Sequence, residues 1–168
     1  RVAVHKQGLS VRTRAGTQSF GWSDVVSLRE ALTERTIKGA PAHMVREYNL
    51  DLSDGSKVTI PFGLENVAAV GEALRDQILP VIGRKAAAAI ERGQSVKFDD
   101  WTVSAKSLRS SAGGELLWKQ AGEAKVEKGQ LRVTKRDGSL WQEKSYADFP
   151  NAPVFLGIFE SLRNNRGA

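Results

Sequence analysis

Three basic residues near the start of the chain have a spacing that suits phosphate binding. Lys6, Arg12 and Arg14 fall in a region whose apolar residues alternate, which predicts neighbouring strands of a hairpin. Adjacent strands can bring such side chains to a shared open end, where each cation makes charge-assisted hydrogen bonds to phosphate oxygens. The alternative is that Arg12 and Arg14 only form the solvated face of a strand. These three residues are the first candidate anion site.

A second set of basic residues lies in the second half of the chain. The net charge is +6, and residues 81–168 hold 15 Lys/Arg against 10 Asp/Glu, whereas residues 1–80 hold 10 against 9. This excess favours an anionic partner, and each Lys or Arg near an anionic membrane contributes about 1 kcal/mol. The alternative is a solvated face that keeps the protein soluble. The candidate residues for an anionic membrane surface are Lys125, Lys128, Arg132, Lys135, Arg136 and Lys144.

No combination of residues predicts catalysis or metal binding. The chain has no cysteine, and its two histidines, His5 and His43, have no nucleophile or acid at motif spacing. Asp99 and Asp100 fall in a predicted turn, where aspartate is favoured because it caps its own backbone. Gly113-Gly114 lacks the Lys-Ser/Thr of a P-loop. We therefore expect no enzymatic activity, no cofactor and no metal.

The aromatic residues favour a protein core over a nucleic-acid surface. Phe20, Trp22, Trp101 and Trp118 occupy inward positions of predicted strands, where they do not form platforms for base stacking. We expect no nucleic-acid partner.

Short strands dominate the first 62 residues. Period-2 alternation predicts a meander of about five strands, with Phe20 and Trp22 on one face and Val26 and Leu28 inward. The polar stretch 29–43, with a glycine and a proline, is expected to be an extended loop. Asp54-Gly55 is a strong hairpin signal because its glycine accepts the positive φ that a type I′ turn needs.

One long helical stretch, residues 64–93, follows the first strands. Apolar residues recur at three- and four-residue spacing from Val67 to Val81, and the alanine-rich turns that follow have high helix propensity. Pro80 lacks an amide hydrogen, so either one kinked helix or two abutting helices is possible. We favour two segments that meet near Pro80, with Gly93 as the C-terminal cap.

The second half repeats the plan of the first. Strand signals return after Gly93, Asp137-Gly138 predicts another hairpin, and a helix is expected from Pro153 to Leu162. Residues 9–24 can be aligned with 108–120, residues 53–56 with 136–139, and residues 64–82 with 149–162. A repeat of about 80 to 90 residues is longer than a solenoid unit, so a duplicated domain is the interpretation.

The order of these motifs resembles the pleckstrin-homology-like (PH-like) superfold and, more closely, an uncharacterised and largely actinobacterial family of tandem PH-like proteins. Asp99 stands where that family is expected to have a glycine after Phe98. The family brings no known enzymatic activity. In eukaryotic PH domains, basic residues spaced like the first candidate set surround an inositol phosphate. The resemblance is carried by Gly8-Leu9 before Arg12, Trp22–Val25, Asp54-Gly55, Gly93–Phe98 with Val103, Leu117-Trp118 and Phe149–Val154.

These observations predict an α+β, mostly β fold of two tandem PH-like modules, each a strand meander closed by a C-terminal helix. Module 1 is expected at residues 1–80, a helical connector at 81–93 and module 2 at 94–168. The chain starts inside a strand signal without an initiator Met, so it is expected to be the soluble, cytoplasmic part of a membrane-anchored bacterial protein, because members of the family often have membrane spans ahead of this region.

The expected function is a non-enzymatic interaction or scaffold module that binds a protein, a peptide or an anionic lipid headgroup. A groove between a sheet edge and a helix could also accept an extended peptide. Two alternatives stay open: a structural domain that assembles through sheet edges, and a lipid-handling or hydrolytic domain with a pocket between the modules.

Overall fold

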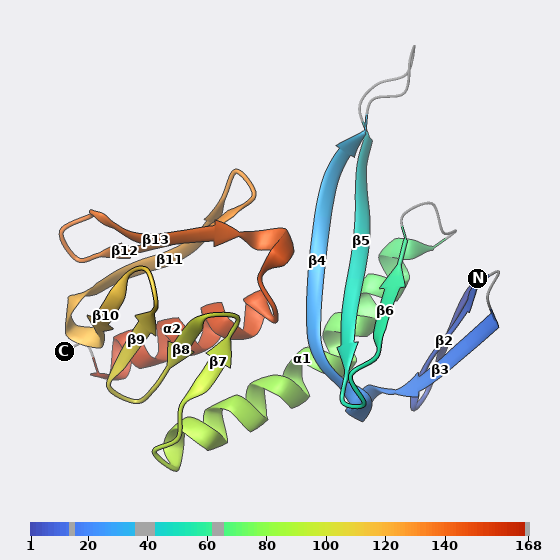
Figure 1. Cartoon of the computed structure of the whole chain (residues 1–168), viewed down its shortest axis with the longest axis horizontal. Coiled ribbons are helices and arrows are strands. Elements are labelled where there is room, and N and C mark those ends of the chain that lie inside the picture. The colour runs from blue at the N-terminus through green and yellow to red at the C-terminus, as the bar shows by residue number, and fades with distance from the viewer. Residues whose placement is uncertain (14–15, 36–42, 62–65, 167–168) are drawn as a thin grey trace. The chain divides into compact units, whose positions relative to one another are not determined.

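The computed structural model describes residues 1–13, 16–35, 43–61 and 66–166. Within these ranges the fold is α+β and mostly β, with 13 strands in four small antiparallel sheets and two α-helices (Figure 1). The chain divides into two compact units, unit 1 at Arg1–Val81 and unit 2 at Ile82–Ala168.

Unit 1 contains two three-stranded meanders. The order in the first sheet is β1-β2-β3 and in the second β4-β5-β6, and Figure 1 shows the long β4–β5 hairpin. Leu9 and Phe20 are buried in the first sheet, and Leu50 and Ile60 in the second. The strands are β1 (Val2–His5), β2 (Gly8–Thr13), β3 (Gly16–Gly21), β4 (Val25–Arg35), β5 (His43–Leu52) and β6 (Lys57–Ile60).

The prediction of a loop over residues 29–43 is wrong for the residues that the structure describes at its two ends. Strand β4 continues to Arg35 and β5 begins at His43, while the loop residues 36–42 lie outside the described part. The polar side chains are accommodated because they pair: Arg29 forms an ion pair with Asp51 on β5. Val26 was expected inward but is 50% exposed, because the pairing shifts between positions 25 and 27 and turns Val25 inward.

The predicted break of the long helix at Pro80 is also wrong. Helix α1 runs without interruption over Val67–Glu91 and contains Pro80 on an exposed position. A proline within a helix removes one backbone hydrogen bond. Buried apolar residues hold the helix on both sides of it, with Ile78 before it and Ala86 and Ile90 after it. Packing therefore outweighs the local preference.

A close approach fixes α1 to strand β5 in unit 1. Tyr48 is fully buried and its hydroxyl accepts a hydrogen bond of 3.3 Å from Arg75 Nη2 on α1. Arg75 also binds both carboxylate oxygens of Glu30, at 3.0 and 3.3 Å. A Cβ at Gly71 would lie 1.8 Å from the Tyr48 hydroxyl oxygen. Glycine is therefore required at this turn of the helix.

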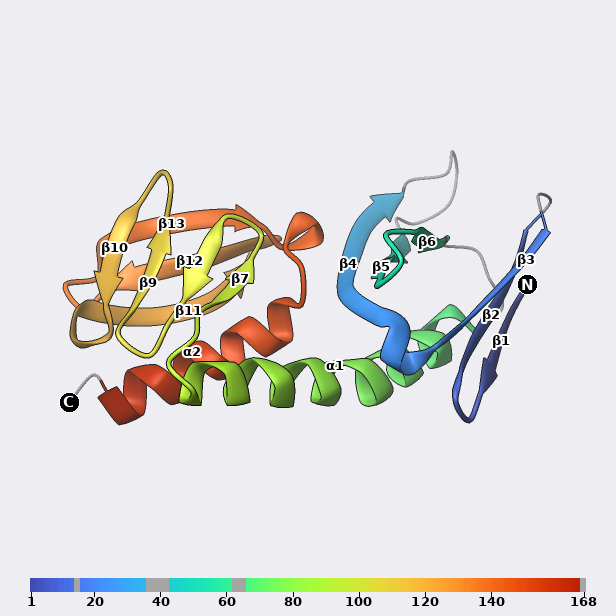
Figure 2. The same ribbon diagram turned by 60° about the horizontal axis from the view of Figure 1, so that its bottom comes forward.

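Unit 2 has a four-stranded sheet and a three-stranded sheet, in the orders β10-β9-β8-β7 and β11-β12-β13. Figure 2 shows both sheets above helix α2 in that view. The elements are β7 (Val96–Phe98), β8 (Trp101–Val103), β9 (Ser107–Ser110), β10 (Gly114–Leu117), β11 (Ala121–Glu127), β12 (Gln130–Lys135), β13 (Leu140–Ser145) and α2 (Ala152–Arg166), so the terminal helix predicted at 153–162 is confirmed with longer bounds.

Aromatic rings fill the core of unit 2. Trp101 is fully buried, with its ring centroid 5.1 Å from Phe149, 5.3 Å from Phe155 and 5.4 Å from Trp141. Trp118 packs edge-on against Phe159 of α2 at 5.5 Å. The sequence prediction that the tryptophans are core residues is confirmed.

The same short motif follows a strand in each unit. A 3₁₀ turn begins with a buried tryptophan, at Trp22–Asp24 (η1) in unit 1 and at Trp118–Gln120 (η2) in unit 2. In both motifs the indole donates to a backbone oxygen, and the third residue of the turn accepts from the amide before the tryptophan. The bonds are Trp22 Nε1 to Lys6 O (3.2 Å), Trp118 Nε1 to Ser104 O (3.0 Å), Gly21 N to Asp24 Oδ2 (2.8 Å) and Leu117 N to Gln120 Oε1 (3.4 Å).

The two Asp-Gly hairpins also share one hydrogen-bond pattern, and both predicted hairpins are confirmed. Only the glycines, Gly55 and Gly138, have positive φ, so the turns are not type I′, which needs it at both central residues. The aspartate side chain instead binds the amide two residues on. The side-chain bond is Ser56 N to Asp54 Oδ1 in unit 1 and Ser139 N to Asp137 Oδ1 in unit 2. The turn itself is closed by Gly55 N to Leu52 O in unit 1 and by Gly138 N to Lys135 O in unit 2. A third bond joins the hairpin to the tryptophan turn, from Ser53 N to Asp24 O in unit 1 and from Arg136 N to Gln120 O in unit 2.

The aspartate that replaces an expected glycine has a left-handed backbone. Asp99 has φ of 59° in the β7–β8 turn. This region favours glycine, and aspartate tolerates it better than most other residues do. The turn thus keeps the backbone conformation that a glycine would adopt. No helix in the described ranges is both long and apolar enough to cross a membrane.

Candidate functional site

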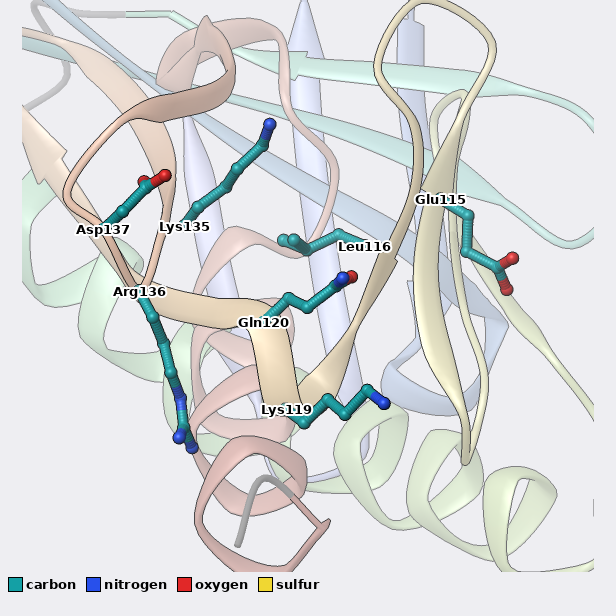
Figure 3. Close-up of a pocket in the computed structure, with 7 residues that line it drawn as sticks. All are labelled: Glu115, Leu116, Lys119, Gln120, Lys135, Arg136 and Asp137. Carbon is teal, nitrogen blue, oxygen red and sulfur yellow. The ribbon is translucent and has the colours of Figure 1, made fainter.

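An open cavity in unit 2 gathers several charged side chains. Its volume is about 490 Å³, and we call it the cationic cavity (Figure 3). Strand β10, the turn η2 and the β12–β13 hairpin supply its walls. The lining residues are Glu115, Leu116, Lys119, Gln120, Lys135, Arg136 and Asp137.

The position of these walls follows from the tryptophan motif. Trp118 is buried in the core, which leaves the next two residues of the turn, Lys119 and Gln120, at the surface. The carbonyl of Gln120 accepts a bond of 2.9 Å from Arg136 N, which ties η2 to the β12–β13 hairpin. Lys119 and Lys135 therefore reach the same cavity from separate elements.

The two carboxylates of the cavity are already bound by their neighbours. The pKa of Glu115 is lowered by hydrogen bonds from the Ser107 hydroxyl, at 2.7 Å, and from Arg109, at 2.8 and 3.0 Å. The pKa of Asp137 is lowered chiefly by the hydroxyl and amide of Ser139, at 2.6 and 2.9 Å. Both groups stay ionised at neutral pH, and one oxygen of each, Glu115 Oε1 and Asp137 Oδ1, is bound by these neighbours. The charge of Lys135 also contributes to the lowered pKa of Asp137.

Lys119 and Lys135 are not neutralised in this way. Among the described residues, no carboxylate lies within 4.0 Å of either ammonium group. Gln120 accepts the Leu117 amide through Oε1, which leaves its NH2 group as a donor. In Figure 3 the tips of Lys119 and Lys135 lie on either side of Gln120 and Leu116, while Arg136 points in another direction and Glu115 points away. Two cations and one amide donor thus border the open space.

The other basic residues of the second set lie elsewhere in unit 2, where most of them form ion pairs. Lys125 binds Glu123 at 2.9 Å, which raises the pKa of Lys125. Arg132 binds Glu127 at 3.0 Å and Glu143 at 3.3 Å. The structure therefore brings together only Lys135 and Arg136 of the six predicted residues.

Lys144 and Lys128 complete this set. Burial disfavours the Lys144 charge, but hydrogen bonds to Asp100 and Asp99 outweigh it and raise the pKa of Lys144. Lys128 has positive φ in the β11–β12 turn, at the other end of β12 from Lys135. Strand geometry separates these two ends by about 16 Å.

The structure does not bring together Lys6 and Arg12, the two described residues of the first candidate set. Lys6 lies in the β1–β2 turn, next to the pair His5–Gly8, whereas Arg12 lies near the far end of β2, opposite Thr17. Four residues of strand separate these ends by about 13 Å. Both side chains are exposed, and Arg14 lies outside the described residues.

Sequence reasoning missed Lys119 and Gln120. A signal existed, because Trp118 was aligned with Trp22 and the residues after a buried tryptophan in a tight turn must face solvent. Arg136 and Lys135 were selected for charge alone, without the bond between η2 and the hairpin that gives them a common cavity.

In the described ranges, no group of three or more His, Asp or Glu residues is placed to hold a metal ion. The Nε2 atom of His5 lies 3.0 Å from Ser10 Oγ on the exposed face of the first sheet. No nucleophile–base–acid arrangement accompanies this contact in the described ranges.

Comparison with known proteins gives a family but no characterised relative. No curated protein and no solved structure matches the chain. One family model, described as a family of unknown function (DUF6585), matches residues 1–167. The chain therefore belongs to this family of unknown function.

Proposed function

We propose that the chain is a non-enzymatic interaction module made of two PH-like units, which binds anionic lipid headgroups on the cytoplasmic side of a bacterial membrane. The PH-like interpretation is supported by the order of elements in each unit, where two antiparallel sheets precede a helix. The repeated tryptophan turn and Asp-Gly hairpin support a duplication, because unrelated units would have no reason to share both sets of hydrogen bonds.

The cationic cavity is the observation that carries the binding proposal. One oxygen of each of its carboxylates is bound within the protein, while Lys119 and Lys135 have no ion-pair partner within 4.0 Å among the described residues. Asp137 acts on Lys135 only through its charge at longer range. An anion placed there would gain charge-assisted hydrogen bonds at no cost in broken ion pairs. Unit 2 also holds the basic excess of the chain, with 15 Lys/Arg against 10 Asp/Glu in residues 81–168.

A lipid surface is favoured over a peptide because the cavity is open and polar. Lys119, Lys135 and Arg136 are all exposed, and the only fully apolar lining residue, Leu116, is buried. A peptide anchor needs apolar area to bury. A structural role in assembly through sheet edges is the second candidate, and it predicts no dependence on lipid charge.

The direct test is co-sedimentation of the protein with vesicles. The proposal predicts binding to vesicles that contain anionic lipid and none to neutral vesicles, with binding that falls as salt is raised because exposed charges are screened. Equal sedimentation with both vesicle types, or none with either, would refute the lipid proposal, and in the second case a protein partner or self-assembly would take its place.

A further inference from the structure

The repeated framework allows the cationic cavity to be compared with its equivalent in the same chain. The tryptophan turn aligns Ser23 and Asp24 with Lys119 and Gln120, and the hairpin aligns Leu52 and Ser53 with Lys135 and Arg136. The four positions carry one negative charge in unit 1 and three positive charges in unit 2.

The shared hydrogen bonds show that the fold does not require these cations. In unit 1 the turn closes with Ser53 N donating to Asp24 O at 2.8 Å, and in unit 2 with Arg136 N donating to Gln120 O at 2.9 Å. Asp54 and Ser56, which bind each other in the hairpin of unit 1, correspond to Asp137 and Ser139 in unit 2, again an aspartate and a serine. Identical residues therefore occur where the backbone needs them, and the charge differs at the solvent-facing positions of Ser23, Asp24 and Ser53. The counterpart of Lys135, Leu52, is instead a buried residue of unit 1.

Asp24 of unit 1 and its counterpart Gln120 of unit 2 also keep the same role toward the backbone and differ in the group that they present to solvent. Both side chains accept a hydrogen bond from the amide that precedes the tryptophan, so both complete the turn. The aspartate leaves a second acceptor oxygen exposed, whereas the glutamine leaves an NH2 donor. The capping role is kept while the outward group changes from one that repels anions to one that binds them.

We infer that unit 2 alone binds the phosphate monoester headgroup of an anionic lipid, held by Lys119, Lys135 and Gln120, and that unit 1 is a counterpart without this site. This inference rests on the proposed function and specifies its ligand. A phosphate monoester carries about −1.5 to −2 charges at neutral pH, with a second pKa near 6. Its three terminal oxygens provide a separate acceptor for each ammonium group and for the amide.

A phosphate diester headgroup fits the three donors less well. It carries a single charge and only two non-bridging oxygens, so it cannot be a separate acceptor for all three donors. The two lysines would then share one charge. The cavity should therefore discriminate between monoester and diester lipids when their total negative charge is matched.

The test uses vesicles of phosphatidylcholine with either phosphatidic acid, a monoester, or phosphatidylglycerol, a diester, at matched surface charge. The test variant is Lys119→Ser/Gln120→Asp, which installs the Ser-Asp sequence that forms the same turn in unit 1. The control is Lys97→Ser/Lys128→Asn, which also lowers the charge of unit 2 by two at exposed positions outside the cavity. Asparagine suits the positive φ of position 128.

A soluble probe separates the site from the membrane. Inorganic phosphate is titrated into ¹⁵N-labelled protein, and amide shifts are followed in both units. We expect saturable shifts at η2 and the β12–β13 hairpin, and none at η1 or the Asp54-Gly55 hairpin. The folded state of each variant is checked in the same spectra.

The expected result is that wild type and control prefer the monoester vesicles, while the test variant loses at least about tenfold in affinity for them, as the loss of one charge-assisted hydrogen bond or more predicts. Affinity for the monoester should also rise between about pH 5 and pH 7 as the headgroup loses its second proton. The lining contains no histidine, and the lowered pKa values of Glu115 and Asp137 keep both carboxyls ionised in this range.

The possible failures are distinct. Equal binding to both anionic lipids with no loss in the test variant would overturn the inference and leave the lipid-binding proposal standing. Phosphate shifts at the cavity without vesicle binding would overturn the membrane proposal and the lipid source of the ligand. Phosphate shifts of equal size in both units would overturn the asymmetry.

Discussion

Two glycines of helix α1 should respond in opposite directions to the same substitution. The Cβ of Gly71→Ala would lie 1.8 Å from Tyr48 Oη, 2.3 Å from its Cζ and 3.0 Å from its Cε2. At Gly83 the nearest heavy atom is Val154 Cγ1 at 4.0 Å, an ordinary contact. Alanine gains about 1 kcal/mol over glycine within a helix at both sites, so the difference between them measures the Tyr48 contact.

The expected cost at Gly71 follows from the surroundings of Tyr48. This residue is fully buried, so its ring can move only by disturbing the core, and overpacking costs about 1–3 kcal/mol. Movement also breaks the bond from Arg75, and a hydrogen bond to a charged group contributes about 1.5–3 kcal/mol. After the helix gain, we expect Gly71→Ala to destabilise the protein by about 3 kcal/mol and Gly83→Ala to stabilise it by up to about 1 kcal/mol.

The assay is urea unfolding followed by far-UV circular dichroism, with the free energy of unfolding extrapolated to water. A second variant locates the clash: Gly71→Ala/Tyr48→Phe removes the hydroxyl but keeps Cζ, 2.3 Å from the new methyl group, so the phenylalanine should restore little stability. If Gly71→Ala is as stable as Gly83→Ala, or if Tyr48→Phe rescues it fully, the packing of α1 on Tyr48 is not as described.

Three further outcomes are expected. Asp100 binds Lys144, and the pKa of Asp100 is lowered in the folded protein. The ionised carboxylate therefore stabilises the fold fully above about pH 4, the pKa of the unfolded state, and this contribution is lost as pH falls through the pKa of the folded state. Asp100→Asn should lose less stability between pH 7 and pH 3 than wild type in the same urea assay. Gly122→Ala should destabilise by at least about 2 kcal/mol in thermal or urea unfolding, because its Cβ would lie 2.4 Å from a carbonyl oxygen of the facing strand. Lys6→Gln/Arg12→Gln should leave binding to anionic vesicles within about twofold of wild type in co-sedimentation, because Lys6 lies in the β1–β2 turn and Arg12 near the far end of β2. A tenfold loss would show that the site lies in unit 1.

The elements that the sequence predicted well are those with strong local signals. Asp54-Gly55 and Asp137-Gly138 form hairpins because their glycines take positive φ and their aspartates bind the following backbone. The terminal helix and the buried tryptophans follow from apolar spacing. These features depend on neighbours in the sequence, so a pattern of a few residues suffices.

The errors occurred where tertiary contacts decide. The sequence around Pro80 favours a break, but apolar residues on both sides of it are buried, and a local pattern cannot weigh that packing. The polar residues after Leu28 suggested a loop, but Arg29 forms an ion pair with Asp51 and Glu30 forms one with Arg75. Charges that are paired in three dimensions resemble solvated charges in a sequence.

The candidate site could be predicted only in part for the same reason. Lys135 and Arg136 were selected because unit 2 is basic, and Lys125, selected with them, is held in an ion pair. What distinguishes these lysines is whether a carboxylate lies within reach: Glu123 lies two residues before Lys125 on β11, whereas no carboxylate lies within 4.0 Å of Lys135 among the described residues. The alignment of Trp118 with Trp22 indicates that Lys119 is exposed, but only the bond between η2 and the β12–β13 hairpin places it at the same cavity as Lys135.

The most direct test of the account compares two double variants of equal charge in co-sedimentation with anionic vesicles. Lys119→Gln/Lys135→Gln removes both lysines of the cationic cavity, and Lys97→Gln/Lys128→Gln removes two exposed lysines of the same unit outside it. The account predicts at least about tenfold weaker binding for the first variant and a change of less than about threefold for the second. Equal losses in the two variants would show that binding follows total charge, and would contradict the claim that the cavity is the binding site.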